Sequence, residues 1–355
     1  MRQIRPPAGP PTASAGLAAA NAGALAGDFL LNNFQFASGE SLPALRLHYR
    51  TLGRPARDEH GVMRNAVLIL HGTGGDGAQF MAGEFAGELF GRGQPLDAGR
   101  YFIVLPDGIG HGQSSKPSNG LGARFPRYGY GDIVEAQYRL LTQGLNVNHL
   151  RLVMGTSMGG MHAWLWGAAH HDFMDALLPL ASLPTQISGR NRVWRRTISD
   201  AIRNDPAWCD GQYREQPPSL RTALQVLFLM SSNPLQRWLQ MPDLAASDAA
   251  LDAAVNEAME QRDANDLLYQ IEASRDYDPG PRLEEITAPL LAINFADDLI
   301  NPPQIGMLER EIRRVAQGQA IVLPCTAESR GHETQMMAAL WKHHLLQLLD
   351  TAPQR

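Results

Sequence analysis

A serine between glycines carries the clearest chemical signal in this chain. Ser157 lies within residues 155–160, Gly-Thr-Ser-Met-Gly-Gly, directly after the apolar segment 150–154. A strand that runs into Gly-x-Ser-x-Gly predicts a sharp turn in which only hydrogen fits at the flanking positions, because strand and following helix pass closely there. Such a turn strains the serine backbone and exposes its oxygen at the carboxyl edge of a sheet. The pattern therefore predicts that Ser157 is a nucleophile.

The base that would activate this serine is expected near the end of the chain. A serine hydroxyl is a poor nucleophile until a base accepts its proton, and a carboxylate must orient that base. Of the eleven histidines, His332 alone combines a loop position, a preceding glycine and a place after the last apolar segment, 320–323. We predict that His332 is the base and that the other histidines have packing or surface roles.

Two adjacent aspartates compete for the role of the orienting acid. Asp297 and Asp298 follow the apolar segment 290–296 and precede Leu-Ile-Asn-Pro-Pro at 299–303. We favour Asp297, because acid-x-apolar-apolar-x-Pro is the usual reading frame of a catalytic turn in this position. Asp298 would then be an exposed turn residue, and it remains the alternative.

Two backbone N–H groups are expected to stabilise the oxyanion of an acyl-transfer reaction. One should come from Met158, immediately after the nucleophile. The other should come from the loop 71–75, His-Gly-Thr-Gly-Gly, where we favour Thr73. We expect His71 to brace this loop rather than to take part in the chemistry.

Other motifs in the chain predict structure rather than cofactor chemistry. Residues 107–114 form a glycine-rich segment without the Gly-Lys-Ser/Thr ending of a phosphate-binding loop, so we interpret it as a structural turn. Cys209 and Cys325 cannot make a disulfide framework, and no Cys/His spacing resembles a zinc site. We therefore expect neither a resident cofactor nor a metal.

Short apolar segments alternate with helical patterns along most of the chain, and they must position these residues. Such alternation predicts an α/β fold with a mostly parallel sheet covered on both faces, and the serine motif specifies the α/β-hydrolase architecture. Residues 29–49 predict two antiparallel strands joined by a turn at 38–40. The expected later strands are 66–70, 101–105, 150–154, 176–180, 289–293 and 320–323.

The strand pattern stops between residues 184 and 281, where the sequence is helical and polar with several Trp and Met residues. We expect an all-helical lid over the carboxyl edge of the sheet, with most of these residues packing in a small lid core and some lining an acyl pocket. The predicted organisation is a leader at 1–27, a first part of the core at 28–183, the lid at 184–285 and a second part of the core at 286–355.

The N-terminal 26 residues allow two interpretations. They contain two early arginines and end in Ala-Leu-Ala, like a cleavage site, but the apolar stretch 18–26 is short and interrupted. We favour a disordered leader and a cytoplasmic protein; a degenerate export signal, and so a periplasmic or secreted protein, is the alternative. A net charge of −5 without long runs of one sign predicts no nucleic-acid partner. No segment approaches the ~20 apolar residues of a membrane span.

Beyond the serine motif, the chain resembles the homoserine O-acetyltransferase-like branch of the α/β hydrolases. The resemblance extends over residues 29–341, and its implied triad is Ser157, Asp297 and His332. The shared motifs include Tyr-Arg-Thr-Leu-Gly at 49–53, Asp-Ile-Val-Glu-Ala-Gln at 132–137, Ser-Met-Gly-Gly-Met at 157–161 and, in the lid, Asp-Pro-Ala-Trp at 205–208.

The departures from this family concern the acceptor. The loop 71–75 has an esterase-like form where homoserine enzymes have His-Ala-Leu-Thr-Gly. The family's Thr-Tyr-Arg-Ser and Arg-Phe-Gly-Arg runs are absent from 228–238, and Glu333 stands where an Asp usually follows the catalytic histidine. An amino acid acceptor needs a cation for its carboxylate and an acid for its ammonium. Arg237 and Glu333 are the candidates for these two roles.

The predicted function is an acyl transfer through an acyl-enzyme on Ser157. We favour hydrolysis of a small-molecule ester or thioester. The alternative is an O-acyltransferase that uses acetyl-CoA as co-substrate and an alcohol such as homoserine as acceptor. A non-catalytic scaffold that serves as a binding module comes last, because such scaffolds typically lose triad members. The sequence leaves a homodimer open.

Overall fold

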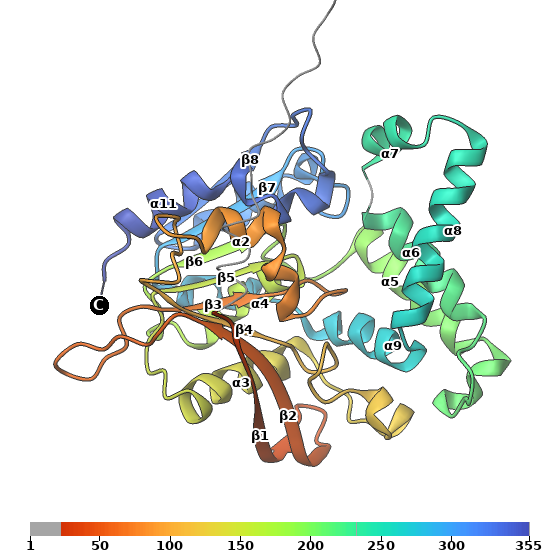
Figure 1. Ribbon diagram of the computed structural model, residues 1–355, viewed down its shortest axis with the longest axis horizontal. Helices are drawn as coiled ribbons and strands as arrows, with labels where there is room; N and C mark the ends of the chain where they lie inside the picture. The colour runs from red at the N-terminus through yellow and green to blue at the C-terminus, as the bar shows by residue number, and fades with distance from the viewer. Residues whose placement is uncertain (1–22, 232, 355) are drawn as a thin grey trace, which may run out of the picture.

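The computed structural model describes residues 23–231 and 233–354, and its centre is an eight-stranded sheet (Figure 1). The strand order is β1-β2-β4-β3-β5-β6-β7-β8. Strands β1 and β2 are antiparallel, β2 is antiparallel to β4, and the remaining pairs are parallel. The strands are β1 (Leu25–Gln35), β2 (Ser41–Leu52), β3 (Ala66–Leu70), β4 (Phe102–Pro106), β5 (Leu152–Thr156), β6 (Leu177–Leu180), β7 (Leu290–Phe295) and β8 (Gly318–Leu323). The predicted α/β-hydrolase sheet is confirmed.

Helices cover both faces of the sheet and one of its ends. They are α2 (Gly83–Leu89), α3 (Tyr130–Arg139), α4 (Met158–Ala169), α5 (Gly189–Arg203), α6 (Ser219–Ser231), α7 (Pro234–Gln240), α8 (Leu244–Gln261), α9 (Ala264–Glu272), α10 (Met307–Glu311) and α11 (Lys342–Thr351), with short 3-10 turns and a π-helical turn, Leu140–Gly144, between them.

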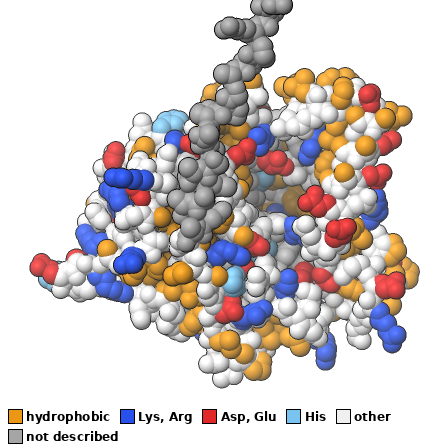
Figure 2. Space-filling view, in the orientation of Figure 1, with side chains coloured by type: hydrophobic (Ala, Val, Ile, Leu, Met, Phe, Trp, Pro, Cys, Tyr) orange, Lys and Arg blue, Asp and Glu red, His pale blue; other side chains and the backbone are white. Residues whose placement is uncertain are grey.

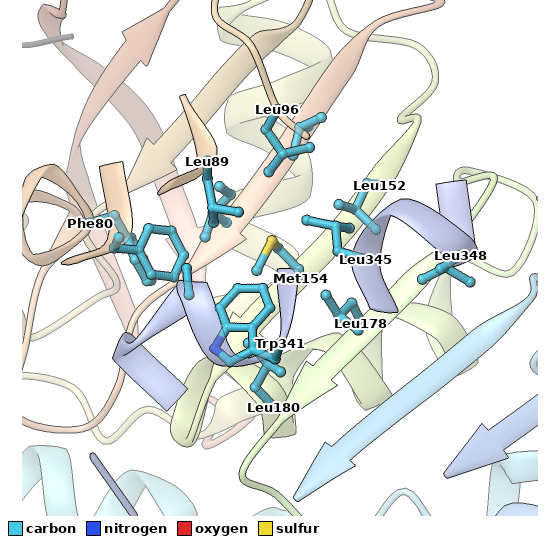
Figure 3. Close-up of a cluster of buried hydrophobic side chains, with 14 of the residues drawn as sticks. Phe80, Leu89, Leu96, Leu152, Met154, Leu178, Leu180, Trp341, Leu345 and Leu348 are labelled. Atoms are coloured by element: carbon cyan, nitrogen blue, oxygen red, sulfur yellow. The ribbon is translucent and has the colours of Figure 1, made fainter. Parts of the chain in front are cut away.

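The central strands are apolar along their whole length because both of their faces are buried. Successive side chains of a strand point to opposite faces. In β5, Leu152 and Met154 therefore pack on one face with α2 and α11, whereas Val153 packs on the other with α3 and α4. Figure 3 shows the first of these layers, in which Trp341 and Leu345 cover Met154.

The strand β1 corrects the predicted N-terminal boundary. Leu25 and Ala26 pair with Thr51 and Arg50 of β2, so the strand begins inside the segment 1–27 that we expected to be a leader. The rest of that prediction, residues 1–22, lies outside the described residues. Within 23–231 and 233–354, no helix is long and apolar enough to cross a membrane.

Between β6 and β7 the described chain is helical. Helices α5 to α9 stand beside the sheet, on the right of Figure 1, and pack around a separate small core. Trp194 and Met230 belong to this core as expected, but Trp238 of α7 is 73 % exposed. The helical segment itself is confirmed; its division into a domain of its own, with bounds at 184 and 285, stays a prediction.

Candidate active site

Ser157 sits on the turn between β5 and α4 in a strained backbone conformation, with φ 55° and ψ −111°. Such a conformation costs ~1–3 kcal/mol for a residue with a side chain and persists only where its surroundings enforce it. A Cβ at Gly155 would lie 2.2 Å from the carbonyl oxygen of Gly159, and a Cβ at Gly159 would lie 1.9 Å from that of Leu70. The turn predicted from the glycine spacing is therefore the turn observed.

His332 reaches this serine from the 3-10 turn Gly331–Met336, after β8. Its Nε2 lies 2.8 Å from Ser157 Oγ, and its Nδ1 lies 2.8 Å from Asp298 Oδ2. The carboxylate can only accept, so Nδ1 carries the proton, and Nε2 is then free to accept the serine proton. The structure thus brings together the predicted serine and histidine, 175 residues apart in sequence.

The acid in contact with the histidine is Asp298, which corrects the prediction of Asp297. Asp298 is 1 % exposed, so the expectation of an exposed turn residue is also wrong. Its Oδ1 accepts hydrogen bonds from the backbone N–H groups of Ile300 (2.8 Å) and Asn301 (3.2 Å). These bonds hold the side chain back over its own turn and aim Oδ2 at the imidazole. The residue that contacts the histidine is therefore one position further along the chain than the sequence pattern predicted.

Asp297 braces the loop that carries the histidine. Its Oδ2 accepts the backbone N–H of Gly331, at 2.9 Å, and the Nδ2 amide of Asn233. Asn233 in turn caps the N-terminus of α7. Asp297 therefore links the lid to the residue that precedes His332, without touching the imidazole.

Asp298 remains ionised despite its burial. Burial by itself raises the pKa of this carboxyl, but the charge and hydrogen bond of His332 and the two backbone N–H groups more than offset it, so the net pKa is lowered. An ionised carboxylate at this point stabilises a protonated imidazole. Asp298 is thus suited to orient His332 and to stabilise its charge.

The loop 71–75 lies directly opposite the serine. A Cβ at Gly72 would lie 3.6 Å from Ser157 Cβ. Met158 opens α4, and the first N–H groups of a helix have no partner within it. The predicted donors Thr73 and Met158 therefore flank the nucleophile; their role at an oxyanion stays a prediction.

His71 anchors this loop to the turn at 107–114. Its Nε2 accepts the backbone N–H of Gly108, and its Nδ1 donates to the carbonyl of Gly72, both at 2.9 Å. The fully buried Asp107 accepts N–H groups of Gly77 and Gln113. The structural interpretation of both segments agrees with these contacts.

A cavity of about 590 Å³ connects the serine and histidine to the lid, and Figure 2 shows the surface hollowed between the lid helices and the body of the molecule. The lid contributes mainly apolar side chains to it, together with Arg195 and Arg262. Glu333 lies exposed on its wall. The lid side chains that line it include Trp194, Leu224, Leu227, Phe228 and Met230.

Arg237 and Glu333 are not brought together as a pair for an amino acid. The guanidinium of Arg237 lies 4.3 Å from the ring centre of Phe228, and Arg237 is not among the residues that line the cavity. Two other arginines, Arg195 and Arg262, do line it and were missed from the sequence. Arg195 occurs in a basic helical stretch and Arg262 in a polar segment between two helices, α8 and α9. Both patterns predict a solvated position, and only the packing of the lid turns these side chains inward.

No cluster of His, Cys, Asp or Glu in the described part of the chain is arranged to hold a metal ion. Cys209 and Cys325 are exposed and unpaired by disulfide.

Comparison with known proteins places these features in a family. Residues 65–328 match the alpha/beta hydrolase fold family. A probable acyltransferase of Methanothermobacter thermautotrophicus is 31% identical over 281 residues, which are 79% of this chain and 85% of that protein. A homoserine O-acetyltransferase of Thermobifida fusca is 36% identical over 195 residues, 51% of this chain and 50% of that protein.

Solved structures share the fold at lower sequence identity. Homoserine O-acetyltransferase from Bacillus anthracis superposes with a TM-score of 0.81 at 20% identity, over 93% of this chain and 98% of that one. An acetylester hydrolase from Corynebacterium glutamicum gives a TM-score of 0.80 at 20% identity, over 92% and 96%. The chain thus belongs to the α/β-hydrolase family, in its homoserine O-acetyltransferase-like branch.

Proposed function

We propose that this protein is a serine-dependent acyl-transfer enzyme and that its reaction is the hydrolysis of a small-molecule ester or thioester. The observation that carries the proposal is the hydrogen-bonded chain from Ser157 through His332 to Asp298, which opens into the cavity beneath the lid. The proposed triad is Ser157, His332 and Asp298.

In the first half of the reaction, Ser157 Oγ attacks the substrate carbonyl carbon while its proton passes to His332 Nε2. Asp298 stabilises the imidazolium that forms. The carbonyl oxygen becomes an oxyanion, which the N–H groups of Thr73 and Met158 stabilise. The C–O or C–S bond to the leaving group then breaks, the leaving group takes the proton from His332, and the acyl group stays on Ser157.

In the second half, a water molecule takes the place of the leaving group. It gives a proton to His332 Nε2 and attacks the acyl carbon, and collapse of the second oxyanion returns the proton to Ser157 and releases the acid. Removing a single oxyanion donor typically costs ~2.7–4 kcal/mol of barrier lowering. The loop 71–75 is therefore as important to this proposal as the triad.

Water is favoured as acceptor because the cavity lacks the expected recognition pair for an amino acid. Arg237 packs on Phe228 outside the cavity lining, and Glu333 stands alone on its wall. The alternative is transfer from acetyl-CoA to homoserine or a similar alcohol, and it is supported by the several relatives that are homoserine O-acetyltransferases. Acetyl-CoA would then be a co-substrate, with no resident cofactor in either case.

Product analysis decides between the two acceptors. The purified protein is incubated with p-nitrophenyl acetate or acetyl-CoA, with and without homoserine, and the products are identified by mass spectrometry. We expect free acetate at a rate that homoserine does not change. Rapid formation of O-acetylhomoserine that outpaces hydrolysis would show that the protein is a transferase.

A further inference from the structure

A buried cation lines the cavity at the lid side, and it has no anionic partner in the part of the chain that the structure describes. Arg195, on α5, is 2 % exposed. Its Nε donates to Asn191 Oδ1 at 3.0 Å, and its Nη1 donates to Ser274 Oγ at 3.1 Å. Both partners are neutral, and the guanidinium carbon lies 4.6 Å from the centre of the Trp194 ring. The third neighbour of the guanidinium is the hydroxyl group of Tyr130, which is neutral as well.

The contrast with another buried arginine shows what is unusual here. Arg151 pairs with Asp175 and also donates to the backbone carbonyls of Leu349, Ala352 and Pro353. Burial of an unpaired charge is costly, so buried arginines normally have such partners. For Arg195, burial lowers the pKa and Tyr130 opposes that shift, but no carboxylate is among the groups that act on it. No carboxylate of residues 23–231 or 233–354 therefore supplies its counter-charge.

Two buried hydroxyl groups connect Arg195 to the loop 71–75. The Tyr130 hydroxyl and Thr73 Oγ1 are buried and lie near each other and near Arg195, but neither makes a well-formed hydrogen bond within the described residues. Burial raises the pKa of Tyr130, whereas the nearby Arg195 and Thr73 side chains lower it, so the three groups are neighbours. Buried polar atoms without partners in a native fold call for a ligand or ordered water. These groups thus offer hydrogen-bond donors next to the reacting centre.

A second guanidinium adds to the positive field. Arg262 lines the same cavity and donates to the backbone carbonyl of Gly74, in the loop beside Thr73. Burial lowers its pKa, and the more distant Asp76 and Asp266 offset that only in part. Among the cavity-lining residues, the one acidic side chain is the exposed Glu333. The walls that face the serine therefore favour an anion.

We propose that the substrate of the acyl-transfer reaction carries a carboxylate and that Arg195 binds it, with Tyr130, Thr73 and Arg262 in support. A guanidinium binds a carboxylate through two parallel hydrogen bonds and neutralises its charge. This inference rests on the proposed function and narrows its substrate class to anionic esters or thioesters. The carboxylate can belong to the acyl chain or to the leaving group.

Two matched substrate pairs test the proposal and separate these sources. The first compares the p-nitrophenyl half-ester of adipic acid with p-nitrophenyl hexanoate, so that the charge is on the acyl chain. The second compares 4-acetoxybenzoate with its methyl ester, so that the charge is on the leaving group. We expect kcat/KM to favour the anionic member of one pair by about tenfold or more, the effect of about 1.4 kcal/mol.

The variant Arg195→Gln should abolish that preference, a loss of about tenfold or more in kcat/KM for the anionic ester, because the substrate carboxylate then lacks its buried cationic partner. Arg196→Gln is the matched control, because Arg196 is exposed on the same helix and pairs with Asp200. It removes the same charge and should leave the preference unchanged. Arg195→Lys keeps the charge and should restore the preference in part.

Binding without catalysis keeps the test independent of turnover. Titration calorimetry with adipate and with benzoate on the Ser157→Ala protein should show binding that Arg195→Gln abolishes in the double variant. If Arg195→Gln does not fold, the same titration on a Ser157→Ala, Tyr130→Phe protein should show weaker binding than on Ser157→Ala alone.

Equal rates within both pairs, with clear turnover of the neutral esters and no binding of either anion, would overturn the inference and leave the proposed function standing. Absence of any ester or thioester turnover, together with carboxylate binding that depends on Arg195, would overturn the proposed function and leave the carboxylate-binding site standing.

Discussion

The two walls of the active-site cavity are built differently. On the core wall, Ser157, His332 and Asp298 are held by a strained turn and by short hydrogen bonds from the ends of β5, β7 and β8. On the lid wall, Leu224, Leu227 and Phe228 contribute apolar surface, and α7 exposes Trp238 and Leu239 to solvent. Rigid strand ends suit atoms that must be placed within about 0.5 Å, whereas a helical cover can vary with the substrate. We therefore expect the core wall to carry the proposed chemistry and the lid wall to set the selectivity.

The largest effect should follow from removing the proposed nucleophile. Ser157→Ala should lower turnover by ~10⁴–10⁶, because among the described residues no hydroxyl other than that of Ser157 is hydrogen-bonded to His332 Nε2. The fold should persist, since the half-buried side chain contributes little packing. Steady-state kinetics and labelling with a fluorophosphonate probe check this; labelling of the Ala variant equal to wild type would place the nucleophile elsewhere.

The two adjacent aspartates should differ strongly. Asp298→Asn should lower kcat by ~10³–10⁴, because an amide in place of the carboxylate favours the wrong imidazole tautomer. Asp297→Asn keeps a hydrogen-bond acceptor for Gly331 and should cost about tenfold or less. Parallel kinetics on the two variants provide a matched pair. Equal losses of kcat would mean that bracing of Gly331 by Asp297 is as important for the reaction as the contact of Asp298 with His332.

Low pH should destabilise the core, which contains buried histidines, more than the lid helices. Burial lowers the pKa of His162 from 6.5 to about 3, and it lowers the pKa of His71 and His111 as well. Residues 189–285, which carry the lid helices, contain no histidine.

Between about pH 6.5 and pH 3 the unfolded chain binds a proton at His162 and the folded chain does not. The free energy of unfolding is therefore unaffected by His162 above about pH 6.5 and decreases as the pH falls from there toward 3. His162→Gln should reduce the loss of Tm between pH 7 and pH 4.5, and His60→Gln, at an exposed position, should not. Thermal melts across this range measure both. If the dependence of Tm on pH is the same in the His162 variant as in the wild type, other groups cause the acid sensitivity.

The smallest effect should come from the lid wall. Phe228→Ala enlarges the cavity without changing the triad, so the preferred acyl chain should become longer by a few methylene groups. Each methylene group changes the discrimination between substrates by at most ~1–3 kcal/mol. Relative kcat/KM values over a series of p-nitrophenyl esters measure the shift. Leu239→Ala, at a 73 % exposed position on α7, is the control and should leave the series unchanged.

The sequence alone determined the parts of this protein that depend on local backbone geometry. The turn at Ser157 needs glycine on both sides, and the apolar segments of the central strands reflect burial on two faces, so the fold class, the helical cover and the serine could be predicted from pattern and spacing. His332 could be predicted because loop position and chain order are both properties of the sequence.

Only the tertiary structure decided which of two neighbouring carboxylates meets the histidine, and which arginines line the cavity. Asp297 and Asp298 have the same chemistry, and their roles differ by how the turn after β7 takes up its backbone hydrogen bonds. Arg195 and Arg237 both lie on lid helices, and the packing of those helices turns one toward the cavity and the other onto Phe228. Contacts between residues far apart in the chain set these outcomes, and no local pattern encodes them.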